Sequence, residues 1–170
     1  MTNTIDCPTF KPTLRIGNRG QDVKEMQKRL ETRFASIYPS SFQIDVDGIF
    51  GSQTESAVKY LQCLAFLETT GITDVATWNF ICNGVKSLPI LRKNSTGNTV
   101  RLLQQTLKDY DFYHGAISGY FDANTEIAVK AFQNDYGLIA DGIIGEKGWT
   151  TLIHLNTHID SCYCSCYKGC

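Results

Sequence analysis

The sequence DGIFGSQTESAVKYLQ, residues 47–62, contains a glycine turn that leads directly into an amphipathic helix. The pair Asp47-Gly48 favours a turn, because glycine adopts a positive φ without a Cβ clash. Ser52 precedes Glu55 with the spacing of a capping box, which predicts that the Ser52 hydroxyl caps the helix start. Apolar residues then follow at helical spacing and predict one buried face: Ala57, Val58, Leu61, Leu64 and Ala65.

A second copy of this stretch occurs as SGYFDANTEIAVKAFQ, residues 118–133. The matching pairs, at a constant offset of 71, include Gly48 and Gly119, Phe50 and Phe121, and Gln62 and Gln133. Upstream of it, LRIGNRGQDVKEMQKRL from Leu14 is matched by LRKNSTGNTVRLLQQTL from Leu91. The chain therefore contains one supersecondary unit twice, which favours two domains.

Each copy is predicted to hold three helices: one at about residues 22–34 in the first copy, the central helix, and a short helix after a second glycine turn. Thr73 or Asp74 is expected to cap that third helix. The predicted fold class is all-α, with two tandem three-helix bundle domains that contain long glycine-turn loops. A unit of about 65 residues has a small core, so the two units are expected to pack on each other. The predicted segments are an extended N-terminal arm (1–13), a first domain (14–83), a linker (84–90), a second domain (91–155) and a cysteine-rich tail (156–170).

Composition excludes several functional classes. Lys+Arg 16 against Asp+Glu 17 leaves a net charge of −1, which argues against nucleic-acid binding, where cationic side chains dominate affinity. No apolar run approaches the ~20 residues of a membrane helix, so no membrane span is expected. The first residues lack the apolar core of a signal peptide, which leaves export by another route, release by lysis, or an intracellular location.

The repeated pattern resembles the bacterial peptidoglycan-binding domain of the three-helix type. The resemblance covers about residues 14–155 and rests on L-x-x-G-x-x-G-x-x-V, on D-G-x-F-G-x-x-T-x-x-A-V and on a glycine turn before tryptophan. The copies depart from this pattern at Phe66 in place of glycine, Ser118 in place of Asp, Asp122 and Asp74 in place of glycine, and Gly148 in place of threonine.

The resemblance implies a non-catalytic module that anchors or targets a protein to peptidoglycan, at the cell wall or at an extracellular or spore surface. Sugar rings stack on aromatic side chains, and the carboxylates of a stem peptide favour arginine or helix N-termini. The candidate ligand-binding residues are Asp47, Gly48, Tyr60, Gln62, Trp78, Arg92, Tyr120, Gln133, Tyr136, Asp141 and Trp149. Core packing is the favoured alternative for both tryptophans. Fixing a loop carbonyl is an equal alternative for both glutamines.

No catalytic motif such as HExxH, GxSxG or Walker A is present, so neither enzymatic activity nor a metal or cofactor is expected. The alternative is a wall hydrolase, or its targeting part, with a zinc centre from His154, His158 and the tail cysteines Cys162, Cys164 and Cys166. The CxCxC spacing is unusual for structural zinc, and it equally suits cross-linking to other chains, as in a coat protein. Cys63 and Cys82 are expected to be small core residues rather than disulfide partners.

Overall fold

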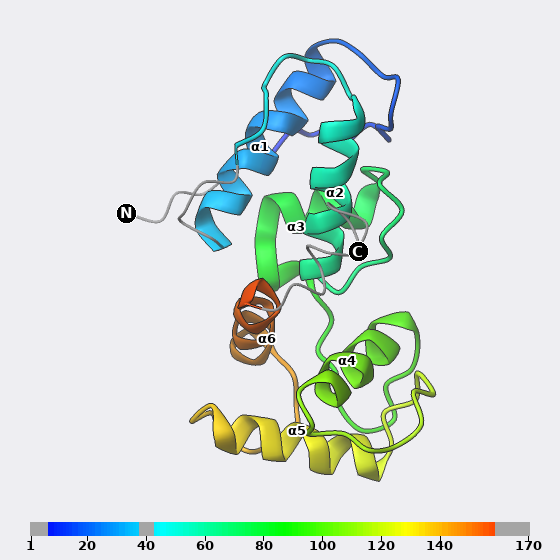
Figure 1. Ribbon diagram of the computed structural model, residues 1–170, viewed down its shortest axis with the longest axis vertical. Coiled ribbons are helices and arrows are strands. Elements are labelled where there is room, and N and C mark those ends of the chain that lie inside the picture. Colours follow the sequence, from blue (N-terminus) through cyan, green and yellow to red (C-terminus); the bar gives the residue numbers. More distant parts are fainter. Residues whose placement is uncertain (1–6, 38–42, 159–170) are drawn as a thin grey trace. The chain divides into compact units, whose positions relative to one another are not determined.

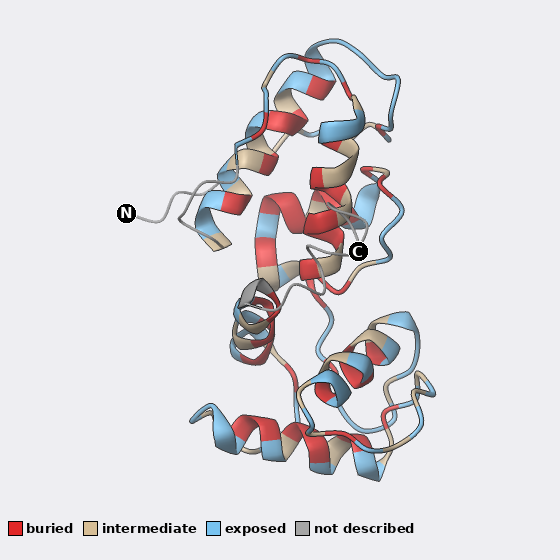
Figure 2. Cartoon of the chain, viewed as in Figure 1, coloured by how far each residue is buried: buried red, intermediate tan, exposed pale blue. Residues whose placement is uncertain are grey.

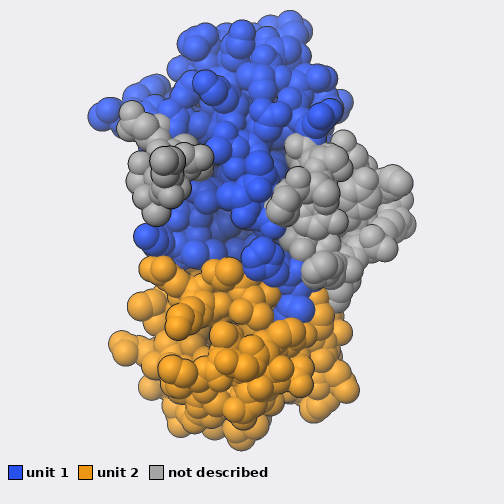
Figure 3. All heavy atoms as spheres, turned by 90° about the vertical axis from the view of Figure 1, so that its left-hand side faces the viewer, with its two compact units in different colours: residues 1–87, 153–170 blue, residues 88–152 orange. Residues whose placement is uncertain are grey.

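The computed structural model describes residues 7–37 and 43–158. Within these ranges the chain is all-helical, with isolated β-bridges instead of strands, which confirms the all-α prediction. The described residues up to Ser87, together with residues 153–158, form one compact unit, and residues 88–152 form the other (Figure 3). No helix in the described ranges is long and apolar enough to cross a membrane.

The first unit contains α1 (Gln21–Ile37), α2 (Ser52–Leu64) and α3 (Val75–Asn83), followed by a 3-10 helix at Gly84–Ser87 (Figure 1). The helix predicted at about residues 22–34 is confirmed and extends to Ile37. The predicted apolar faces of α1 and α2 are buried, and α3 adds Trp78 and Ile81 to the same core (Figure 2). The buried residues of α1 include Val23, Met26, Leu30 and Phe34.

The second unit contains α4 (Asn98–Asp109), α5 (Ala123–Asp135) and the first part of α6 (Glu146–His158). Its three helices confirm the prediction that each copy repeats one three-helix pattern. The core residues occupy the same relative positions as in the first unit: Val100, Leu103, Leu107, Phe121, Val129, Phe132, Trp149 and Leu152. Phe121 corresponds to Phe50, and each is fully buried directly before the central helix of its unit.

The capping box predicted at Ser52 is wrong. Ser52 is already the first residue of α2, and the N-cap position is taken by Gly51, which provides no side-chain cap. Glu55 pairs instead with Lys59 one turn later, at 3.2 Å. In α3 the prediction of a cap is confirmed for Asp74, whose side chain accepts a hydrogen bond from the Thr77 backbone N–H.

A leading loop in each unit, residues 14–20 and 91–97, pairs with both glycine loops of that unit. In the first unit the bridges join Leu14 to Thr73 and Arg19 to Ile49. In the second unit they join Leu91 to Ile144 and Thr96 to Tyr120. The backbone bonds repeat as well, since Gly20 N donates to Gly48 O and Gly97 N donates to Gly119 O, both at 2.9 Å. Each leading loop therefore holds the starts of two helices in register.

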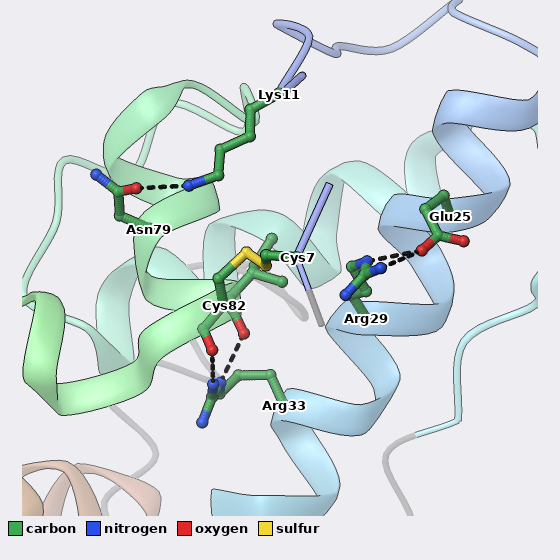
Figure 4. Close-up of a disulfide and its surroundings, with 8 residues drawn as sticks. Cys7, Lys11, Glu25, Arg29, Arg33, Asn79 and Cys82 are labelled. Atoms are coloured by element: carbon green, nitrogen blue, oxygen red, sulfur yellow. Dashed lines mark hydrogen bonds and ion pairs between the residues drawn. A yellow bond between two sulfur atoms is a disulfide. The ribbon is translucent and has the colours of Figure 1, made fainter. Parts of the chain in front are cut away.

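A disulfide between Cys7 and Cys82 fastens the N-terminal arm to the end of α3, with a Cα–Cα distance of 5.8 Å (Figure 4). The Arg33 guanidinium donates to the carbonyls of Ile81 and Cys82, at 2.9 Å each. Partial burial at this position lowers the pKa of Arg33. The expectation that Cys82 and Cys63 are unbonded core residues is wrong, because Cys63 is disulfide-bonded as well. The pairing of Cys82 with Cys7 was not predictable from helical periodicity, because the N-terminal arm has no such periodicity.

Candidate functional site

A buried glutamine closes the first glycine loop of the first unit. Gln27 is fully buried, and its Oε1 accepts a hydrogen bond from Gly48 N at 2.8 Å. Its Nε2 lies within hydrogen-bond distance of Asp47 Oδ1 at 2.9 Å, and of Ile49 O and Thr54 Oγ1 at 3.1 Å each. We call this arrangement of glutamine, glycine loop and following helix start a glutamine corner.

The glutamine corner occurs four times, twice in each unit. In the three further corners the glycine N donates to glutamine Oε1 at 2.9 Å: Gly71 to Gln62, Gly119 to Gln104, and Gly142 to Gln133. A threonine six residues after the glycine donates or accepts in three corners, at Thr54, Thr77 and Thr125, and Gly148 takes its place in the fourth. The short pattern of glycine, then threonine six residues later, is a sequence signal for three of the four corners and misses the fourth.

Each corner holds one carboxylate, at either of two positions. In the first and fourth corners, Asp47 and Asp141 precede the glycine and accept from the glutamine Nε2, at 2.9 and 2.8 Å. In the second and third corners, Asp74 and Asp122 follow the glycine by three residues and accept from the threonine hydroxyl, at 2.7 and 2.8 Å. The carboxylate therefore comes from a different sequence position in different corners, but in each corner it accepts hydrogen bonds from residues of that corner.

Hydrogen bonds lower the pKa of three of these carboxyl groups. The largest cause is the Gln27 amide for Asp47, the Thr125 backbone N–H for Asp122 and the Ile143 backbone N–H for Asp141. A carboxyl group with a lowered pKa is ionised at neutral pH and does not donate a proton. These groups therefore suit a structural role better than general acid catalysis.

Several of the predicted ligand residues belong to the corners or to the core. Gln62 and Gln133 are buried and bind the Gly71 and Gly142 loops, as the structural alternative anticipated. Asp141 belongs to the loop bound by Gln133, whereas Asp47 and Gly48 belong to the loop bound by Gln27. The structure therefore places these five residues within three corners, two in the first unit and one in the second, rather than around one common site.

Three of the aromatic ligand candidates are buried in the cores of the units: Tyr60, Trp78 and Trp149. Trp78 and Trp149 are each 1% exposed, and their Nε1 atoms donate to Pro12 O and Pro89 O at 2.8 Å. Each tryptophan thus fixes the segment that precedes the leading loop of its unit. Tyr60 is also buried and stacks on Phe34, with ring centroids 5.7 Å apart.

Five of the predicted ligand residues are exposed: Asp47 in the first unit, and Arg92, Tyr120, Tyr136 and Asp141 in the second. Arg92 and Tyr120 lie on the paired leading loop and glycine loop, and the Tyr120 hydroxyl donates to Asn94 Oδ1 at 2.8 Å. Tyr136 lies at the end of α5, where its ring packs on Phe132 at a centroid distance of 5.1 Å. Arg92 and Tyr120 are therefore brought to the same loop pair, whereas Tyr136 belongs to an aromatic cluster.

Both units present a similar exposed surface along the leading loop. We define this leading-loop face as residues 15–19 with Ile49 in the first unit, and residues 92–96 with Tyr120 in the second. Arg15 and Arg92 occupy equivalent exposed positions. Ile49, 38% exposed, corresponds to Tyr120, 45% exposed. The face thus combines a cation with an exposed apolar or aromatic side chain in both copies.

Two surface pockets of the second unit are lined by described residues alone. One, of about 420 Å³, lies against the fourth corner and is lined by residues of the glycine loop and the start of α6, including Ile139, Asp141, Lys147 and Gly148. The other, of about 330 Å³, lies between the loop after α4 and the first turns of α5. Sequence reasoning identified neither pocket, because both depend on how separate segments meet.

The described residues contain no group of three or more His, Cys, Asp and Glu side chains that could hold a metal ion. His154 lies exposed on α6. The alternative zinc site also requires the His158 side chain and the cysteines at 162, 164 and 166, which lie outside the described residues.

Two segments of the chain, residues 19–81 and 96–152, match the family model of the peptidoglycan binding domain. Together they cover more than half of the sequence. The chain belongs to the peptidoglycan binding domain family. Each peptidoglycan-binding segment begins in a leading loop and ends within the third helix of its unit, so each contains two glutamine corners.

Relatives of the chain include two proteins named N-acetylmuramoyl-L-alanine amidase. CwlM of Mycobacterium tuberculosis is 30% identical over 65% of this chain and 29% of its own length. CwlL of Bacillus licheniformis is 34% identical over 78% of this chain and 42% of its own length. This peptidoglycan-binding chain therefore spans less than half the length of either relative.

Two further matches cover less of this chain. The spore cortex-lytic enzyme of Bacillus subtilis is 37% identical over 38% of this chain and 21% of its own length. The crystal structure of the SleB N-terminal domain is 33% identical and covers 39% of this chain and 92% of that chain, with a TM-score of 0.39.

Proposed function

We propose that the chain binds peptidoglycan without cleaving it and so holds a protein at the bacterial cell wall or spore surface. The observation that carries this proposal is that both family segments fold as complete three-helix units. The names of the relatives, amidases and cortex-lytic enzymes, support an association with the wall.

The leading-loop face is the surface that we assign to this binding. Its exposed Arg15 and Arg92 offer bidentate hydrogen bonds to the carboxylates of stem peptides. Ile49 and Tyr120 offer exposed apolar area on the same face. Because the face is present in both copies, the chain has two equivalent sites for a polymer that repeats its own chemistry.

Non-catalytic binding agrees with the chemistry of the corners. The carboxylates of Asp74 and Asp122 are engaged by a neighbouring threonine hydroxyl and backbone N–H within the same loop. Asp47 and Asp141 are engaged by a glutamine amide. Acid–base cleavage requires a carboxyl group whose pKa is matched to its task, usually by raising it. Hydrogen bonds instead lower the pKa of Asp47, Asp122 and Asp141.

Two weak sites on one chain gain affinity through effective concentration, which here requires that both units reach the polymer. The double variant Arg15→Ala/Arg92→Ala should therefore lose more retention on purified sacculi than either single variant. The control is Lys28→Ala/Lys108→Ala, which removes two exposed cations from α1 and α4. Retention of wild type that does not exceed its retention on cellulose would overturn the proposed function. Equal retention of the Arg15→Ala/Arg92→Ala variant and wild type would show that the leading-loop face is not the binding surface.

A second candidate function is suggested by the amidase relatives. The chain would then be the targeting part of a wall hydrolase, and the catalytic chemistry would reside in another segment of that hydrolase. Release of soluble muropeptides by the purified chain would favour catalysis by the chain itself, whereas retention without release would favour the binding role.

A further inference from the structure

We propose that the 330 Å³ pocket of the second unit binds one N-acetylated amino-sugar residue of a glycan strand. This inference rests on the proposed function, because it identifies the part of the polymer that one surface of the second unit recognises. The pocket lies between residues 112–115, which follow α4, and residues 124–128 at the start of α5. It is separate from the leading-loop face and from the pocket at the fourth corner.

The chemistry of the lining points to a neutral ligand with an apolar part. Phe112, Tyr113, Ile127 and Ala128 provide the apolar wall, and no Asp, Glu, Lys or Arg is among the lining residues. Small-molecule sites are mostly apolar, with a few placed polar groups. A stem peptide with free carboxylates would find no cation here, whereas an acetamido sugar brings a methyl group and an uncharged amide.

Two polar side chains complement that amide. The carboxamide of Asn124 supplies both a donor and an acceptor, and the imidazole of His114 supplies further hydrogen-bonding capacity. Both residues are exposed, so their polar groups are reachable from solvent. The volume of about 330 Å³ lies at the lower end of the range of ligand pockets, about 300–1,000 Å³, which suits a single sugar residue.

The apolar wall is held in place by contacts within the second unit. The Tyr113 hydroxyl donates to Ala116 O at 2.8 Å. A Cβ added at Gly115 would lie 2.6 Å from that hydroxyl oxygen, so glycine lets the loop pass close over the ring. Phe112 packs edge-to-face on Phe132, with ring centroids 5.9 Å apart. The pocket is therefore formed before a ligand arrives, which lowers the entropic cost of binding.

The chain offers a matched pair of variants for the test. Ile127 lines this pocket and is 66% exposed, whereas Ile139 lines the pocket at the fourth corner and is 80% exposed. Ile127→Glu and Ile139→Glu make the same chemical change at exposed positions of the same unit. Asn124→Ala tests the amide separately, at an exposed position in the first turn of α5.

The probes are soluble tetramers of N-acetylglucosamine and of glucose, titrated into the full chain by calorimetry. We expect wild type and Ile139→Glu to bind the acetylated tetramer equally. We expect Ile127→Glu to bind it at least about tenfold more weakly, since a charge is placed against the apolar part of the ligand. Asn124→Ala should reduce the preference for the acetylated tetramer over the glucose tetramer.

Retention on sacculi is measured in parallel so that the two proposals can fail separately. Wild type that is retained on sacculi but ignores the acetylated tetramer would refute this pocket assignment and leave the proposed function standing. Equal binding of the tetramer by Ile127→Glu and wild type, or weakening only by Ile139→Glu, would also refute it. Absence of retention on sacculi would refute the proposed function itself, and this inference with it.

Discussion

Thr73 and Ile144 occupy equivalent positions in the two units, but only Thr73 carries a polar group that requires a hydrogen-bond partner. Thr73 is fully buried, and its Oγ1 has no hydrogen-bond partner among the described residues. The equivalent position in the second unit is Ile144, which is also fully buried and needs no partner. A buried hydroxyl without a partner keeps its desolvation cost, about 1–3 kcal/mol.

Thr73→Val should therefore stabilise the first unit by about 1 kcal/mol, because valine keeps the shape and removes the unsatisfied hydroxyl. The reverse exchange in the second unit, Ile144→Thr, should destabilise it, since it removes apolar atoms and buries a hydroxyl. Urea unfolding of both variants measures the two free-energy changes. A loss of stability in Thr73→Val would show that its hydroxyl is satisfied after all.

The Asp122 carboxylate provides a pH-dependent contribution to stability. Its folded pKa is lowered by hydrogen bonds from Thr125, so the stabilisation is fully present above the ordinary aspartate value of about 4 and is lost as the pH falls through the folded pKa. In Asp122→Asn, the side chain at this position does not titrate.

The stability difference between wild type and Asp122→Asn should therefore be largest near neutral pH and should shrink below about pH 4. Urea unfolding at a series of pH values measures this difference. A matched control is Asp135→Asn, because Asp135 is exposed at the end of α5 outside the corners. A constant difference between wild type and Asp122→Asn across that range would contradict the assignment.

At the scale of the elements, helical periodicity predicted the helices well. The spacing of Val23, Met26, Leu30 and Phe34 predicted the buried stripe of α1, because one face of a helix meets one core. The helix start at Ser52 was less predictable. The spacing of Ser52 and Glu55 satisfies a capping box, but the tight loop places Gly51 at the cap position and Ser52 inside the helix.

The ligand candidates were harder to predict than the helices, because repetition alone does not separate binding residues from structural ones. Gln62 and Trp78 recur in both copies, and a repeated polar or aromatic residue is compatible with either a site or a structural role. The structure gives both residues internal partners, namely Gly71 and Pro12. The exposed pockets could not be predicted at all, since their walls come from segments whose approach is set by tertiary packing.

The exchange of carboxylate positions among the corners predicts that one corner can be converted into another. In the second corner, Thr70 Oγ1 accepts from Gln62 Nε2 at 3.2 Å and from Ile72 N at 3.1 Å. These are the same roles that Asp47 Oδ1 performs in the first corner. A carboxylate at position 70 should therefore substitute for the one at Asp74.

Asp74→Gly should destabilise the first unit by about 1 kcal/mol, because it removes the cap of α3 and the acceptor of the Thr77 hydroxyl. The double variant Thr70→Asp/Asp74→Gly should recover most of that loss, since it recreates the Asp–Gly arrangement of the first corner. A double-variant cycle by thermal unfolding measures the coupling. Additive losses would show that the positions are not interchangeable.

At the scale of the whole molecule, the two units differ in how their first segments are fixed. Both tryptophans bind a preceding proline carbonyl, but only the first unit among the described residues has a disulfide whose two cysteines are both placed, Cys7 and Cys82. Closing a loop with a sequence separation of 75 constrains the unfolded chain strongly. The mutual packing of the units expected from the sequence stays a prediction.

The variant Cys7→Ser/Cys82→Ser should lower the stability of the first unit by about 4 kcal/mol, from the chain-entropy value for a loop of this length. Amide hydrogen exchange should show faster opening in α1 to α3. The amides of α4 and α5 serve as the internal control, because the disulfide lies in the other unit. Unchanged protection of α1 to α3 would show that the non-covalent contacts of the arm suffice.

The same sulfur–sulfur bond sets the path of mechanical tension through the chain. A force applied between the arm and the linker enters at Cys7, crosses directly to Cys82 and leaves shortly afterwards through Gly84–Ser87 (Figure 4). The intervening residues, and with them α1 and α2, carry none of it. After reduction the same pull would act on the bundle itself, and its unravelling would add about 250 Å of extended chain. A wall-bound protein stressed by a growing or swelling polymer would thus keep its first unit folded for as long as that bond stays oxidised.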